Sequence, residues 1–178
     1  MAQIIDIREG ALRQARGRLF LEWAQRAGHR VEPGTTLGQL SDGLLWILAQ
    51  ADLKGNSLLE ELIVLIRLGT RRPSSSLSPE LRLEILDFSL FLLDQARFEC
   101  MVRLGWIEPL PARDLPLVQL LCLPLERLRE IKQSPRLRED HPQFHWFQRL
   151  SSLDKETFLR RQIPHALELF RRRVHGSG

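Results

Sequence analysis

Residues 78–105 have the sequence SPELRLEILDFSLFLLDQARFECMVRLG, and this stretch decides the fold. Ser78 is suited to cap a helix, and Pro79 follows at the first turn, where a missing N–H costs nothing. Apolar side chains then recur every three or four residues, which is the period of one helical face. The pattern predicts a long central helix over residues 79–104 that ends at Gly105. Its apolar residues are Leu81, Ile85, Phe88, Leu92 and Ala96, with Leu86, Leu90, Leu93 and Cys100 beside them.

Helical signals also precede this segment. We expect a first helix over residues 6–27, closed by Gly28, and a second over 42–51, capped by Ser41 or Asp42. After a turn at 52–56, Ser57 and Glu60 have the capping-box spacing and predict a helix over 58–68. Residues 70–78, which contain four serines and a proline, are predicted to form an exposed loop.

Prolines divide the segment after the central helix into short pieces. We expect helices over 115–123 and 124–133, an irregular stretch at 134–142, and a helix over 143–150. Two more helices are predicted over 153–162 and 164–174, with a turn at Ile163 and Pro164.

The composition supports an all-α fold, an irregular bundle of about seven to nine helices. Leucine dominates, β-branched residues are scarce, and tyrosine is absent, which favours helices over strands. With 43% apolar and 27% charged residues the chain is globular, and at this length it buries enough surface to fold without a disulfide or a metal. We expect a main bundle at 1–133 and a basic helical subdomain at 134–178 packed on it, or a single domain over 1–175.

Several functional classes lack their sequence signals. No apolar run reaches the ~18 residues of a membrane span, and residues 1–9 do not resemble a signal peptide, so we expect a cytoplasmic protein with no membrane partner. Glycine-rich phosphate loops, the serine-hydrolase elbow and C-x-x-C pairs are missing. Cys100 and Cys122 are interpreted as inert core thiols. The sequence therefore favours a protein with no catalytic residues and no cofactor.

A metal site is a weaker alternative. His141 and His145 are four residues apart, within metal-ligand reach on a helix, and Glu139 and Asp140 precede them. Pro142 places His141 at a helix start, and no third ligand is indicated. We therefore interpret the segment as a helix start with exposed imidazoles. The acidic residues Glu80, Glu84, Asp87 and Asp94 are interpreted as a solvated face of the central helix, with Arg97 able to pair with Asp94.

A polyanion site is the second alternative. Residues 125–178 hold twelve basic and seven acidic side chains, a net charge of +5. Arginines near a helix C-terminus also complement the helix dipole without any ligand. Nucleic acid is thus an alternative partner but not the favoured one. The polyanion-binding candidates are Arg160, Arg161, Arg171, Arg172 and Arg173.

The favoured function is an adaptor, accessory or regulatory protein that acts through protein contacts, either with a partner protein or by self-association. Phe91 and Phe98 share the acidic stripe of the central helix, which makes that face a candidate contact. Phe144 and Trp146 belong to the densest aromatic run, FHWF at residues 144–147. Such a run either packs on the core, which we favour, or forms a partner site.

Overall fold

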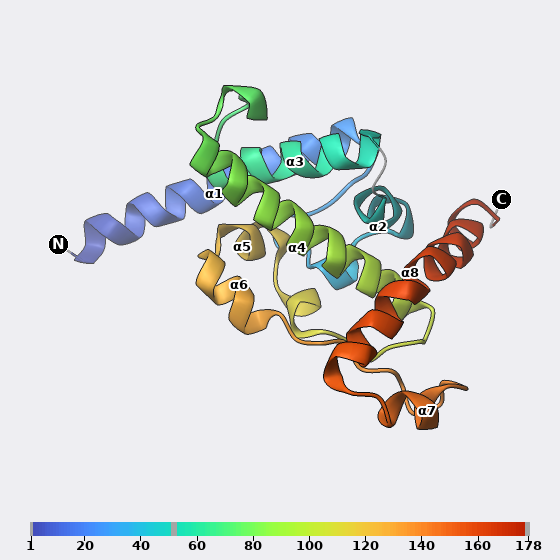
Figure 1. Ribbon diagram of the computed structural model, residues 1–178. Helices are drawn as coiled ribbons and strands as arrows, with labels where there is room; N and C mark the ends of the chain where they lie inside the picture. The colour runs from blue at the N-terminus through green and yellow to red at the C-terminus, as the bar shows by residue number, and fades with distance from the viewer. Residues whose placement is uncertain (1, 51–52, 177–178) are drawn as a thin grey trace.

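The structure is a computed structural model that describes residues 2–50 and 53–176. In these residues the chain forms eight α-helices, three short 3-10 helices and no strand (Figure 1), which confirms the predicted all-α bundle. The elements are α1 (Ala2–Arg26), η1 (Leu37–Gln39), α2 (Asp42–Ala49), α3 (Leu53–Leu68), η2 (Ser74–Ser76), α4 (Pro79–Arg103), η3 (Pro111–Asp114), α5 (Leu117–Cys122), α6 (Leu125–Ile131), α7 (Phe144–Gln148) and α8 (Ser152–His175).

The predicted long central helix is confirmed as α4, which crosses the molecule and packs against α2, α3 and α8 (Figure 1). The Ser78 hydroxyl accepts a hydrogen bond from the Leu81 N–H, and Pro79 is the first helical residue. Gly105 follows the helix with a φ of 77°, a conformation that side chains with a Cβ disfavour. Both ends of α4 are thus set by local sequence.

Two clusters of buried apolar side chains meet along α4. The larger cluster joins its N-terminal half, through Phe88 and Leu92, to α1, α2, α3, α5 and α6. The smaller cluster joins Phe98 and Met101 to the segment after α4, to α7 and to α8. Phe170 of α8 belongs to the larger cluster, so α8 connects the two.

The predicted start of α3 was wrong. The helix includes Leu53, so residues 53–56 are helical instead of a turn, and Ser57 lies inside the helix and does not cap it. Asp52, where the predicted turn begins, lies outside the described residues. Gly55 in a helix costs about 1 kcal/mol relative to alanine. Burial of Leu59 and of residues 62–66 outweighs that cost.

The predicted break at Ile163 and Pro164 was also wrong, because α8 is continuous through Pro164. A proline inside a helix loses one backbone hydrogen bond and crowds the preceding turn. Burial of Leu159, Ile163 and Ala166 on both sides of it keeps the helix intact. The two predicted helices over 153–162 and 164–174 are therefore one helix.

Replacing Pro164 with alanine should stabilise the protein. Pro164 is exposed, so its ring contributes little packing, and alanine restores the missing N–H donor. We expect Pro164→Ala to raise the free energy of unfolding by roughly 1–3 kcal/mol in urea denaturation. The exposed Arg161→Ala variant, one turn earlier, is the control and should change it much less. A lower stability for Pro164→Ala would contradict this account of α8.

A buried ionic network joins α4 to its neighbours. The Glu99 side chain is only 1% exposed, and its carboxylate accepts hydrogen bonds from Arg103 Nε at 3.1 Å and from Arg113 Nε at 2.9 Å. Arg103 also donates to Asp42 at 2.5 Å, and Asp42 lies 2.9 Å from Nε of Arg173. These five side chains tie α4 to η3, α2 and α8.

The polar groups around this network are also hydrogen bonded. Arg103 also donates to the carbonyl oxygen of Gly38 at 3.2 Å, which fixes the chain just before α2. Among the described residues no buried side-chain nitrogen or oxygen atom lacks a hydrogen-bond partner. A buried charge is costly unless it is paired, so the buried Glu99 carboxylate depends on Arg103 and Arg113, whereas Arg173 at the outer end of the network is 49% exposed.

Removing the charge of Glu99 should destabilise the fold strongly. Glu99→Gln leaves the Arg103 and Arg113 guanidinium groups without their shared anion, and we expect a loss of about 3–5 kcal/mol in urea denaturation. The matched control is Glu130→Gln, which breaks the exposed Arg127–Glu130 pair and should cost less than about 1 kcal/mol. Equal losses for the two variants would show that the buried network does not hold α4 in place.

Candidate protein-contact surface

Three large leucines are exposed along one face of α4. Leu83, Leu86 and Leu90 are 64%, 51% and 54% exposed, and their spacing of three and four residues places them in line on one face. We call them the leucine row. The opposite face of α4, with Phe88 and Leu92, is fully buried. The helix is therefore apolar on two sides, and only one of them is covered by the chain itself.

Grooves flank the leucine row on both sides. Between α4 and α6 lies a groove of about 230 Å³, lined by Leu90, Leu125 and Leu128 among others. On the other side a groove of about 540 Å³ is lined by Leu86 and Leu90 together with residues of α3 and η2. Leu90 thus borders both grooves and Leu86 borders one, and such a ridge beside grooves is a shape that a partner helix can fit.

One helix beside the α4–α6 groove carries acidic side chains, and the other carries basic ones. Asp87 and Asp94 come from α4, whereas Arg129 and Lys132 come from the end of α6. Asp94 is held by Arg160 at 2.9 Å. Asp87, Arg129 and Lys132 are exposed and form no ion pair within the part of the chain that the structure describes.

The remaining members of the predicted acidic face differ in their surroundings. Glu84 is held by Arg67 of α3. Hydrogen bonds from its own backbone N–H and from Ser78 lower the pKa of Glu80 at the start of the helix. Arg97 hydrogen bonds through Nε to the carbonyl oxygen of Ala49 at 3.1 Å, while Asp94 is hydrogen bonded to Arg160. Part of the predicted solvated face is thus engaged in contacts between helices.

The predicted aromatic contacts occupy different environments. Phe91 and Phe98 are 8% and 4% exposed, so they pack inside the chain and present little surface to a partner. Both residues belong to the acidic stripe of α4, but this stripe borders the buried face of the helix, so their rings reach the core. Phe144 is half-buried, whereas Trp146 is 53% exposed and meets the ring of Phe158 edge to face at 5.2 Å. Of these four residues, only Trp146 has a largely exposed ring.

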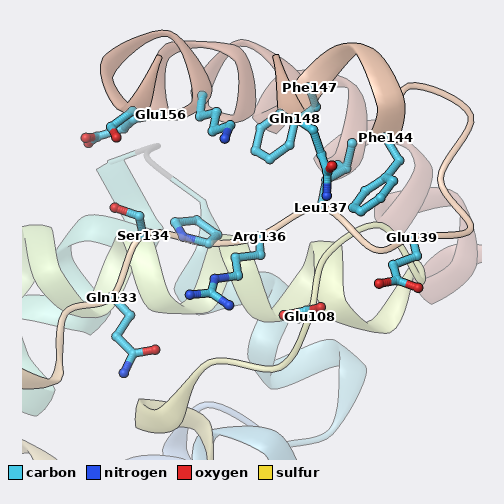
Figure 2. A pocket seen from close by; sticks show the side chains of 13 residues that line it. Glu108, Gln133, Ser134, Arg136, Leu137, Glu139, Phe144, Phe147, Gln148 and Glu156 are labelled. Atoms are coloured by element: carbon cyan, nitrogen blue, oxygen red, sulfur yellow. The ribbon is translucent and has the colours of Figure 1, made fainter. Parts of the chain in front are cut away.

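The aromatic run also borders a pocket of about 710 Å³ (Figure 2). Phe144 and Phe147 of α7 line one side, and Arg136 and Glu108 come from two neighbouring segments that pair through the Glu108 N–H and the Arg136 carbonyl. Glu139, Glu156 and Lys155 add charges of both signs. The pocket combines opposite charges with two phenyl rings, and its lining includes neither of the predicted metal-ligand histidines and none of the predicted polyanion arginines.

The two predicted metal-ligand histidines do not form a ligand group. His141 is half-buried, and its Nδ1 accepts a hydrogen bond from the Gln143 N–H at 3.2 Å. Burial lowers the pKa of His141. His145 is exposed beside Phe144. In the residues that the structure describes, no group of three or more His, Cys, Asp or Glu side chains is placed to hold a metal ion.

A serine–histidine contact that the sequence did not suggest lies before α2. The Ser41 hydroxyl is 3.1 Å from Nδ1 of His29 and also accepts the Leu44 N–H as a helix cap. Catalytic serine–histidine pairs need a third group that orients the imidazole. Across residues 2–50 and 53–176 no carboxylate is hydrogen bonded to His29, so this contact serves as a helix cap.

The arginines of the predicted polyanion site are largely paired with carboxylates. Arg160 binds Asp94 and Glu156, and Arg173 lies 2.9 Å from Asp42. Hydrogen bonds from Arg171 and Arg172 lower the pKa of Glu168 to about 2, so Glu168 stays ionised beside them. Arg161 is the one candidate that forms no ion pair among the described residues.

The two cysteines are poor nucleophiles. Cys100 is fully buried, and burial raises the pKa of its thiol to about 12. Cys122 is half-buried, and burial raises its pKa as well. Because the thiolate is the reactive form, the raised pKa values lower the reactivity of both thiols.

Comparison of the chain with protein-family models, with curated proteins and with solved structures finds no match. None of the described helices is both long and apolar enough to cross a membrane.

The leucine row was only partly anticipated from the sequence, which placed Leu86 and Leu90 beside the buried face and did not single out Leu83. The 83, 86, 90 spacing is the signal that identifies the row.

The leucine row should contribute little to the stability of the single chain. We expect Leu83→Ser, Leu86→Ser and Leu90→Ser each to lower the free energy of unfolding by less than about 1 kcal/mol, because more than half of each side chain is already in water. Leu92→Ala, on the buried face, should cost about 2–5 kcal/mol. The measurement is urea denaturation at a protein concentration low enough to prevent association. Large losses in the leucine row would assign it to the core.

Proposed function

We propose that the protein is a non-enzymatic helical adaptor, accessory or regulatory protein that acts through protein contacts at the leucine row. The observation that carries this proposal is the exposure of Leu83, Leu86 and Leu90 on one face of the central helix. Exposed apolar side chains scattered singly are normal, whereas a contiguous group indicates a contact surface.

The anchoring of α4 supports this proposal. Its opposite face is buried, and the Glu99 network fixes its C-terminal half, so the row is presented on a helix that is already ordered. A preorganised surface loses less conformational entropy on binding. Full burial of a leucine is worth about 1.5–3 kcal/mol, and because each leucine of the row is 51–64% exposed, covering it gains roughly half of that.

The polyanion alternative has less support. Four of its five candidate arginines are paired with carboxylates, and a phosphate would have to displace those carboxylates. The metal alternative has less support because His141 and His145 gather no further ligand among the described residues. Trp146 remains a second, smaller candidate for a protein contact.

Photo-crosslinking in the host cell tests the proposal. A photoreactive amino acid at Leu86 should yield covalent adducts of higher mass, which mass spectrometry of the adduct identifies. The matched control is the same amino acid at Leu153, which is 75% exposed on α8 and does not belong to the row. Adducts from position 86 alone support the proposal. Equal yields at both positions, or none at 86, would contradict it.

A further inference from the structure

We infer that the partner at the leucine row is a second copy of this chain, held in a two-fold symmetric dimer through the α4–α6 groove. The inference rests on the proposed function and names the partner of the same surface. In a two-fold dimer each contact occurs twice, because residue i of one copy meets residue j of the other and the reverse. Such a surface has to be complementary to itself.

The charges beside the groove meet this requirement. Asp87 on α4 is negative, Arg129 and Lys132 at the C-terminal end of α6 are positive, and none of the three forms an ion pair among the described residues. When α4 of one copy lies against α6 of the other, Asp87 approaches the partner's basic pair. The symmetry repeats this contact, so both acidic and both basic groups find a counterion.

The apolar residues between these charges fit the same arrangement. Leu90 is half exposed at the rim of the groove, and Leu128 is buried at its floor. The row of one copy can enter the groove of the other, as ridges of one helix pack into grooves between neighbouring helices. A nucleic acid is a poorer match, because Asp87 and Asp94 would repel its phosphates.

Charge reversal followed by mixing tests the dimer. One variant is Asp87→Arg, and the other is Arg129→Asp/Lys132→Asp. We expect sedimentation velocity to show a dimer for the natural chain, and dimer dissociation constants raised at least about tenfold for each variant alone, because like charges then face each other twice. An equal mixture of the two variants should form a heterodimer close to natural affinity, since both contacts become attractive.

The controls separate association from folding. Arg127→Asp is the matched change on α6, because Arg127 is exposed but already paired with Glu130 and does not line the groove; it should leave the dimer intact. Leu90→Glu should abolish the dimer while the far-ultraviolet circular dichroism spectrum keeps the helical signal of the natural chain. Recovery of the dimer in the mixture also shows that both charge variants are folded.

Two results would overturn the inference. One is a natural chain that sediments as a monomer over about two decades of concentration. The other is a mixture that associates no better than the separate variants. If the chain is monomeric but the crosslinker at Leu86 captures a different protein, the homodimer fails while the proposed contact function stands. A dimer that Leu90→Glu leaves intact would be a third such result, because it would exclude the leucine row from the interface.

Discussion

The position of α4 depends on one buried carboxylate. Glu99 is shielded from water, and its charge is balanced by Arg103 from the same helix and Arg113 from η3. Through Arg103 and Asp42 the same network reaches Arg173 at the end of α8. A buried anion is stable only while its partners stay in place, so the ends of distant segments are constrained together. This constraint specifies one arrangement of helices that apolar packing alone would leave less defined.

The network also explains how the two faces of α4 differ in role. Phe88 and Leu92 on the buried face stabilise the bundle through removal of apolar surface from water. The leucine row contributes little to the stability of the chain itself, because more than half of each side chain stays in water. With α4 fixed by its core contacts and by Glu99, the exposed face is rigid, and its apolar surface can be covered only by another molecule.

The predictable features were those that local chemistry controls. Ser41, Ser78 and Gly105 act within one turn of their own positions, so the start of α2 and both ends of α4 followed from sequence. The errors at Ser57 and Pro164 have the opposite cause, since tertiary burial overrode the local signals there. The Glu99 network was not predictable, because Arg113 and Asp42 are brought to Glu99 only by the tertiary fold.

The same distinction applies to the candidate site. Residue type and spacing identified Phe91 and Arg160 as candidates, but exposure and pairing decide function, and both are tertiary properties. Phe91 is buried because it belongs to the larger apolar cluster, and Arg160 is engaged because α8 crosses near Asp94. The leucine row is the apolar surface that the chain leaves uncovered. Its exposure is therefore better evidence for a protein contact than residue type and spacing alone. Beside the row, one groove carries unpaired charges of both signs. A surface of this kind is complementary to a second copy of itself, so an identical chain can supply every missing counterion.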